Sequence, residues 1–198
     1  MIKSNITASM VGKLRSQTGA GVKDCKEALD QTDGDFDKAI DFLRKKGIES
    51  AGKKADRATA EGLIKSYIHT GNKIGVLLEI KCETDFVAKN EEFKELARDL
   101  CMHIAATAPQ FISRDDVSKE LIDREREIAA AQVKDKPAAV VQKIVTGKLE
   151  KFYAEICLME QPFVKDPDHT VKDLLSEKIS KIGENLVVSR FTRYQLGE

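Results

Sequence analysis

The chain has 198 residues, enough for one or two domains, and 41% of them are apolar, so it can bury a substantial core. Lys plus Arg and Asp plus Glu both number 33, and a net charge of zero argues against binding to a nucleic-acid backbone, which needs a basic excess. No apolar run approaches the ~18 residues of a membrane helix. Residues 1–5 lack the pattern of a secretory or transit segment. We therefore expect a cytoplasmic protein that contacts neither a membrane nor nucleic acid directly.

Residues 5–46 have the pattern of three short helices. Gly19 separates the first helix from the second, Asp35 is expected to cap the third, and Gly47 is expected to end it. Apolar side chains recur at helical spacing in each helix: Ile6, Met10 and Leu14, then Val22, Cys25, Ala28 and Leu29, then Phe36, Ala39, Ile40 and Leu43. Three short helices bury only a small core and usually serve for binding, so residues 1–47 are expected to be a docking module.

Residues 48–60 are rich in Lys, Ala and Gly and are expected to form a linker. A solvated linker helix is the interpretation that we favour. A basic binding patch made by Lys53, Lys54 and Arg57 is the alternative.

A β-hairpin is expected next, because Leu63–His69 alternates between apolar and polar residues and Thr70–Lys73 forms a turn before the longer strand Ile74–Cys82. Leu186–Tyr194 has the composition of a final strand, which needs this hairpin as its partner. Four helical patterns lie between them, at Glu91–Ala108, Ser118–Val133, Ala138–Cys157 and Val171–Ile182.

The second and third of these helices are joined only by residues 134–137, with Pro137 suited to the first helical position. So short a joint predicts an antiparallel helical hairpin at about 118–158. Together these elements predict an α+β fold, in which residues 61–198 form an antiparallel sheet packed on helices behind the three-helix module.

The turn after the second strand is the most informative segment of the chain. It reads Thr84-Asp85-Phe86-Val87 and places a large aromatic ring beside a carboxylate. Since turns are exposed, Phe86 either folds back into the core or faces a partner. Asp85 could also cap the helix that follows.

Patterns of catalytic sites are weak. The histidines are scattered, no serine lies in a GxSxG elbow, and Gly19-Ala20-Gly21 lacks the Gly and Lys of a phosphate-binding loop. Cys101 and His103 lie on one helix without further metal ligands nearby. The cysteines form no CxxC pair and follow apolar patterns, so all are expected to be buried thiols: Cys25, Cys82, Cys101 and Cys157. We expect no enzyme activity, no cofactor and no metal ion.

Four segments, in this order and spacing, resemble those of bacterial translation elongation factor Ts in a short form. They are Leu14-Arg15 with Thr18–Leu29, then Ala60-Glu61-Gly62, Glu83–Asn90 and Gln161–Asp166. The resemblance covers the chain from about Ile6 to its end. Members of this family promote guanine-nucleotide exchange on the GTPase elongation factor Tu. The resemblance implies a ubiquitin-associated fold for the three N-terminal helices.

The resemblance also implies the residues that contact the GTPase. Asp85 and Phe86 match the pair that intrudes near its Mg²⁺ and phosphate loop, where the ring enters a pocket between two helices. Thr84 and Val87 complete the motif as cap and packing residues. The docking contact of the first module matches Leu14, Arg15, Thr18, Gly19, Ala20 and Gly21, although Lys23 stands where many relatives have Met.

A further contact is implied for His103, because Met102–Ala106 resembles a family helix that reaches a second domain of the GTPase. A His satisfied within this protein is the alternative. Phe163 is interpreted as a packing residue. A short form offers less surface for each chain, which favours a homodimer and a 2:2 complex.

Two other functions stay open from the sequence. The three-helix module could belong to an adaptor that docks another protein, with the sheet domain as its scaffold. An enzyme of unrecognised type would need a polar pocket that the sequence does not reveal. The sequence also leaves open whether the helical hairpin touches the GTPase or a second chain.

Overall fold

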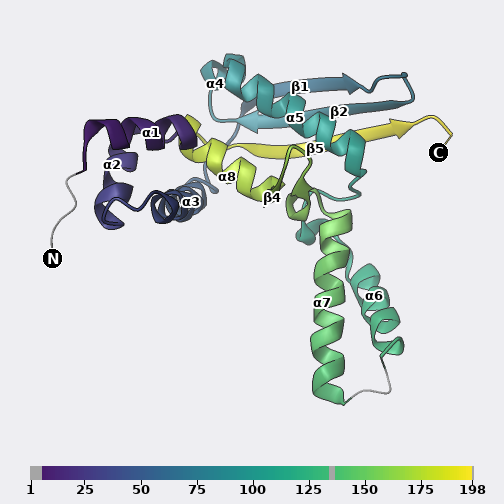
Figure 1. Cartoon of the computed structure of the whole chain (residues 1–198). Coiled ribbons are helices and arrows are strands. Elements are labelled where there is room, and N and C mark those ends of the chain that lie inside the picture. The colour runs from purple at the N-terminus through teal and green to yellow at the C-terminus, as the bar shows by residue number, and fades with distance from the viewer. Residues whose placement is uncertain (1–5, 134–136, 198) are drawn as a thin grey trace.

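The computed structural model describes residues 6–133 and 137–197. Figure 1 shows three parts: a bundle of three helices at the N-terminal end, a sheet covered by helices, and a long helical hairpin that projects away from the sheet. The mixed helix-and-strand architecture confirms the predicted α+β fold. Residues 134–136, at the predicted joint of the helical hairpin, lie outside the described residues.

The N-terminal module consists of α1 (Ala8–Thr18), α2 (Val22–Gln31) and α3 (Phe36–Gly52). Its small core is built from the buried side chains of Leu14, Cys25, Ala28, Leu29 and Ala39. Asp35 caps α3 as predicted, since its carboxylate accepts a hydrogen bond from the Lys38 N–H at 3.1 Å.

The third helix does not end at Gly47, as the sequence suggested, but continues to Gly52. Gly47 is buried in the helix, and a β-carbon there would lie 3.8 Å from the Cβ of Ser180. The glycine therefore lies where the helix passes close to another element, and it does not act as a stop signal. The first part of the expected 48–60 linker is consequently helical.

The main sheet has three antiparallel strands in the order β1–β2–β5, formed by Glu61–Ile68, Ile74–Cys82 and Val187–Gln195. This confirms the predicted hairpin and its pairing with the final strand. Alternate residues of β2 enter the core, where Val76, Leu78 and Ile80 are buried. A second, small sheet joins β3 (Pro162–Phe163) to β4 (Asp166–Thr170), and the sequence reasoning missed it because β3 has only two residues.

Helix α5 (Glu91–Thr107) packs over β1 and β2, and α8 (Val171–Ile182) completes the same core with Val171, Leu175 and Ile179. A short helix, α4 (Asp85–Lys89), connects β2 to α5. Helix α8 lies between the N-terminal module and the sheet (Figure 1) and packs along α3. Arg44 of α3 bonds Asp173 of α8 at 3.0 Å.

The helical hairpin consists of α6 (Lys119–Ala131) and α7 (Ala138–Ile156), which pack against each other as predicted. Pro137 occupies the N-cap of α7, one position before the predicted N1. A 3₁₀ turn at Arg114–Asp116 precedes α6, and another, Leu158–Glu160, follows α7. Arg114 holds the base of the hairpin, because its guanidinium bonds Glu150 at 2.6 Å and Glu160 at 2.7 Å.

All four cysteines are free thiols buried in the structure, as the apolar patterns predicted. Burial raises the pKa of Cys82 and Cys157 to about 11 and that of Cys101 to about 12. These thiols are therefore protonated at neutral pH and act as small apolar core residues.

Candidate protein-interaction site

The 84–87 turn, formed by Thr84, Asp85, Phe86 and Val87, begins where β2 ends and forms the first residues of α4. Thr84 is the N-cap of this helix, and its hydroxyl accepts a hydrogen bond from the Val87 N–H at 3.4 Å. The predicted capping role of Thr84 is confirmed, and the alternative cap, Asp85, is the first residue of the helix instead. Val87 packs against the main core, as predicted.

Phe86 points away from the protein. Its side chain is 83% exposed, the most exposed of the large apolar side chains in the part of the chain that the structure describes. This excludes the alternative in which the ring folds back into the core. An aromatic ring held in water on an ordered turn is typical of a surface that binds another protein.

Asp85 lies beside Phe86 and stays ionised. Its carboxylate accepts a hydrogen bond from the Lys89 ammonium at 2.7 Å, and this contact, one helical turn away, holds the pKa of Asp85 below its usual value. The pair is exposed to solvent, so its contribution to stability is small. The Asp85 carboxylate is therefore an anionic group next to the apolar ring of Phe86 at the tip of the turn.

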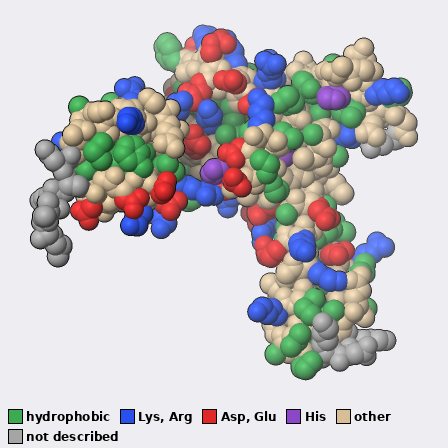
Figure 2. Space-filling model, in the orientation of Figure 1, with side chains coloured by type: hydrophobic (Ala, Val, Ile, Leu, Met, Phe, Trp, Pro, Cys, Tyr) green, Lys and Arg blue, Asp and Glu red, His purple; other side chains and the backbone are tan. Residues whose placement is uncertain are grey.

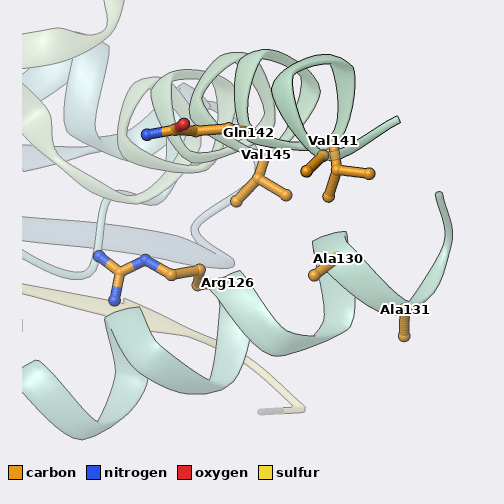
Figure 3. Close-up of a pocket in the computed structure, with 7 residues that line it drawn as sticks. Arg126, Ala130, Ala131, Val141, Gln142 and Val145 are labelled. Carbon is orange, nitrogen blue, oxygen red and sulfur yellow. The ribbon is translucent and has the colours of Figure 1, made fainter. Parts of the chain in front are cut away.

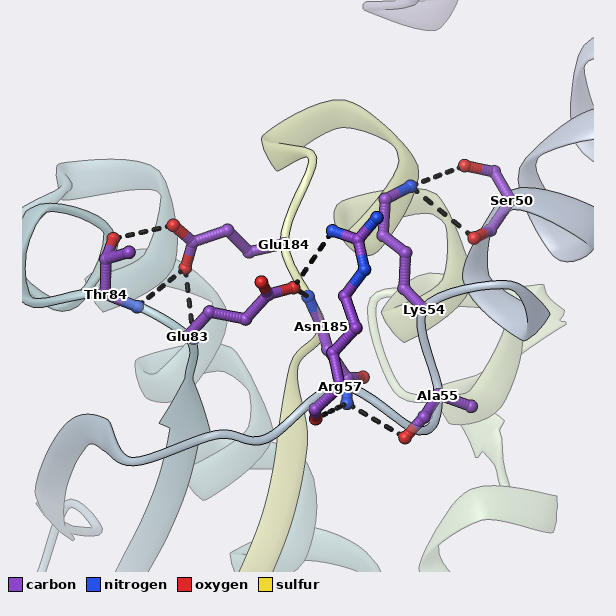
Figure 4. A network of polar contacts seen from close by, with 8 residues as sticks. All are labelled: Ser50, Lys54, Ala55, Arg57, Glu83, Thr84, Glu184 and Asn185. Carbon is purple, nitrogen blue, oxygen red and sulfur yellow. Dashed lines mark hydrogen bonds and ion pairs between the residues drawn. The ribbon is translucent and has the colours of Figure 1, made fainter.

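The turn is fixed from behind by residues that the sequence reasoning missed (Figure 4). The Glu184 carboxylate accepts hydrogen bonds from the backbone N–H groups of Glu83 and Thr84, both at 3.0 Å, and from the Thr84 hydroxyl at 2.6 Å. Glu184 follows α8 and is separated from Thr84 by 100 positions in the chain. No local sequence pattern links segments this far apart.

The 14–21 segment, which the sequence analysis assigned to docking, is only partly available. Leu14 is fully buried in the core of the module, because helical spacing places it on the inner face of α1, and its contact with a partner stays a prediction. Thr18 is half-buried and donates to the Leu14 carbonyl at 2.8 Å. Exposed members of the segment are Arg15, Gly19 and Gly21, and Ala20 is half-buried.

His103, for which a partner contact stays a prediction, lies inside the free protein. The imidazole is fully buried, and its Nδ1 accepts a hydrogen bond from the Val164 N–H at 3.2 Å. This leaves Nε2 as the donor to Gln161 Oε1 at 3.0 Å. Phe163, buried as predicted, lies against the ring. His103 therefore joins α5 to residues 161–164 inside the protein, which is the alternative that the sequence left open.

Burial holds the pKa of His103 below its ordinary value, and this predicts a pH dependence of stability. As the pH falls from about 6.5 towards 5, the unfolded chain takes up a proton that the folded chain does not, so the free energy of unfolding decreases. The carboxylates whose pKa values are lowered, such as Asp173 and Glu92, release their stabilisation below about pH 4, outside this window.

Urea unfolding across that window checks this expectation. His103→Gln should show a flatter dependence between about pH 5 and about pH 7 than the wild-type protein. Parallel curves for the wild-type protein and His103→Gln would contradict the assignment.

The two candidate surfaces meet at the C-terminal end of α8. Lys181 approaches Gly19 of the 14–21 segment, where a β-carbon would lie 3.3 Å from the Lys181 side chain. Three residues further on, Glu184 holds Thr84 of the 84–87 turn. The structure thus brings together the exposed part of the docking segment and the exposed aromatic turn, while His103 lies apart from both, inside the core.

An open groove lies between the two helices of the helical hairpin (Figure 3). It is lined mainly by Ala130, Ala131, Val141 and Val145, with Arg126 at its edge. Its lining is too apolar to be a catalytic site. Figure 2 shows that basic and acidic side chains are interspersed over the visible face of the molecule, in keeping with the net charge of zero. No helix in residues 6–133 or 137–197 is long and apolar enough to cross a membrane.

A three-helix module set against an α+β domain that carries an exposed aromatic turn is typical of a factor that binds another protein. The profile of the family described as elongation factor TS matches residues 49–198. Elongation factor Ts of Carboxydothermus hydrogenoformans is 58% identical over 195 residues, which are 98% of this chain and 90% of the relative. The chain belongs to the elongation factor Ts family.

Other relatives are similar in extent. Elongation factor Ts of Thermodesulfovibrio yellowstonii is 56% identical over 194 residues and is covered to 97% of its length. That of Moorella thermoacetica is 53% identical over 195 residues and is covered to 96%. The predicted resemblance to a short bacterial form is therefore confirmed.

Proposed function

We propose that this protein is a guanine-nucleotide exchange factor that binds elongation factor Tu in its GDP form and promotes release of GDP, so that GTP can bind during translation elongation. It acts in the cytoplasm as a binding protein without catalytic residues or a cofactor of its own. Membership of the elongation factor Ts family supports this function. The observation that carries it is the exposed Phe86 ring on an internally braced turn.

The proposed mechanism uses the 84–87 turn as a wedge. A GTPase holds GDP through a phosphate-cradling loop and Mg²⁺. Phe86 gains apolar contact only when a pocket of the GTPase opens for it, and Asp85 brings a negative charge towards the Mg²⁺ and phosphate contacts. Both effects favour the nucleotide-free state of the GTPase over the GDP-bound state.

One ring does not supply the whole effect. Complete burial of a Phe side chain contributes roughly 1.5–3 kcal/mol, and each ~1.4 kcal/mol of coupling changes GDP affinity tenfold. A second contact surface is therefore needed to bind the GTPase before GDP leaves. The exposed Arg15, Gly19 and Gly21, with Val22 next to them, are proposed as that surface.

Reciprocal coupling tests the proposal. If the protein weakens GDP binding by a given factor, GDP must weaken binding of the protein by the same factor. Titration calorimetry should therefore give tighter binding to nucleotide-free elongation factor Tu than to its GDP complex, by at least about a hundredfold. Equal affinities would contradict exchange activity and favour an adaptor that uses the three-helix module alone.

A homodimer in a 2:2 complex is proposed as the active assembly. The face of the main sheet opposite the core exposes apolar side chains on all three strands: Ile64 and Ile68 on β1, Leu77 on β2, and Val187 and Tyr194 on β5. The register places Ile68 and Tyr194 on either side of Gly75, next to Leu77, whereas the ion pairs of Glu79 with Lys81 and Arg190 separate these residues from Val187. A patch of this kind typically marks a protein interface.

Light scattering coupled to size-exclusion chromatography checks the assembly. The wild-type protein should elute with the mass of two chains, and Leu77→Lys should elute as one, because a charge buried in an apolar interface loses its hydration. Lys148→Ala, a charge change on the distant helical hairpin, serves as the control. A wild-type monomer at all concentrations would contradict the dimer.

A further inference from the structure

We propose that Glu184 is a positioning residue for nucleotide exchange, which holds the 84–87 turn in the orientation that presents Phe86 to the GTPase. This inference rests on the proposed function and adds to it a residue outside the turn. It also assigns α8 the role of fixing the distance between the two surfaces that bind the partner.

The first observation is how completely the Glu184 carboxylate is used. One oxygen, Oε2, accepts from the backbone N–H groups of both Glu83 and Thr84, and the other, Oε1, accepts from the Thr84 hydroxyl. Hydrogen bonds to an ionised group are about twice as strong as those between neutral groups. Two consecutive amides bound to one oxygen fix the direction in which the chain leaves β2 and enters α4.

The second observation is that the turn also bonds back to the segment that contains Glu184. The Glu83 carboxylate accepts from the Asn185 backbone N–H at 2.6 Å and from the Arg57 guanidinium at 3.4 Å. The buried Asn185 side chain donates to the carbonyls of Ala55 and Arg57 at 3.1 and 3.0 Å. Figure 4 shows that these residues form one connected network between the turn, the start of β5 and the linker.

Besides Glu184, the turn is held by Val87 and Ala88, which pack against the main core, and by the Cys82 thiol, which donates to the Thr84 carbonyl at 3.2 Å. Helix α4 has only five residues. Isolated helices shorter than ~12 residues are marginally stable in water. Phe86 cannot anchor the turn, since its ring lies in solvent. Without Glu184, these contacts would still hold α4 to the core, but the N–H groups of Glu83 and Thr84 would lose their acceptor, and ordering these two residues again would oppose binding.

The third observation is the position of Glu184 at the end of α8. This helix contacts the N-terminal module through Arg44 with Asp173, through Ser180 beside Gly47, and through Lys181 beside Gly19. The same helix thus holds the docking surface by its side chains and the wedge by the residue that follows its C-cap, Gly183. Binding of the module therefore carries the wedge to a defined place on the partner.

Stopped-flow release of a fluorescent GDP analogue from elongation factor Tu tests the inference. Glu184→Ala should lower the maximal release rate at saturating protein about tenfold, which corresponds to about 1.4 kcal/mol, while the half-saturating concentration stays within about twofold. The reason is that initial docking uses the first module and remains intact. Glu177→Ala removes an exposed carboxylate from the same helix and should behave as the wild-type protein.

Glu184→Gln separates geometry from charge. Its amide oxygen can accept both backbone N–H groups and its amide nitrogen can face the Thr84 hydroxyl, so the maximal rate should stay within about threefold of wild type. Thr84→Val, which removes the hydroxyl but keeps the shape, provides a second loss variant if Glu184→Ala fails to fold. Urea unfolding of every variant verifies folding.

Amide hydrogen exchange of the free protein gives a readout without the GTPase. In Glu184→Ala the Glu83 and Thr84 amides should exchange at least about tenfold faster, with core amides of β2 unchanged. Wild-type exchange rates at these amides would overturn the inference. So would an unchanged maximal release rate, a loss confined to the half-saturating concentration, or equal losses in the Ala and Gln variants. Failure of the wild-type protein to release GDP would instead refute the proposed function, while the amide rates would still test the bracing.

Discussion

Phe86→Ala is expected to slow the maximal release of GDP from elongation factor Tu by about one to two powers of ten. The ring is 83% exposed in the free protein, so nearly all of its apolar surface is still available for burial against a partner. Burial of this surface contributes roughly 1.5–3 kcal/mol, which corresponds to that range of rates. The loss should appear in the rate at saturation, because the contact forms as the GTPase rearranges.

Stability is the internal control for this variant. Because Phe86 takes little part in the core, Phe86→Ala should unfold in urea within about 0.5 kcal/mol of the wild-type protein. Leu196→Ala removes another apolar side chain, 76% exposed near the C-terminus, and should leave GDP release unchanged. Phe86→Ala with wild-type release kinetics would show that the ring is not the wedge.

Gly62→Ala is expected to lower the free energy of unfolding by about 3 kcal/mol. Gly62 lies opposite Lys81 where β1 begins, with φ of 150°, a region that L residues rarely adopt. A β-carbon there would lie 2.3 Å from the Ile80 carbonyl oxygen and 2.8 Å from the Lys81 Cα. Because both neighbours are backbone atoms, the two strands would have to separate, and strain and lost pairing add together.

Gly12→Ala is the matched control for this substitution. Gly12 lies in the exposed face of α1, and a β-carbon there would meet nothing within 4 Å. Alanine is a better helix former than glycine, so this change should raise stability by up to about 1 kcal/mol. Urea unfolding of both variants checks the pair, and a Gly62→Ala protein as stable as wild type would contradict the close approach of the strands.

The strands of the main sheet and several helix ends could be predicted because local chemistry determines them. The bounds of β2 and α8 agree with the sequence patterns, because a run of mostly apolar residues marks the strand and apolar residues at helical spacing mark the helix. The end of α3 was predicted too early, at Gly47, because a glycine can either end a helix or allow close packing within it. Here Gly47 allows close packing against Ser180. Only the three-dimensional neighbours distinguish these two uses.

The candidate site was predicted in part for the same reason. The sequence drew attention to Phe86 but left open whether its ring points into the core or into solvent. The packing of Val87 and the cap at Thr84 decide that direction. Matching a family segment cannot separate a contact residue from a core residue within it, and Leu14 and His103, which were predicted as contacts, are buried in the free protein. Glu184 was missed because its contacts join segments far apart in the chain.

The most direct test of exchange activity is the release of a fluorescent GDP analogue from elongation factor Tu, followed by stopped flow at increasing concentrations of the wild-type protein. The predicted result is a release rate that rises with protein concentration and saturates well above the spontaneous rate. A folded protein that leaves the spontaneous rate unchanged at every concentration would contradict the proposed function.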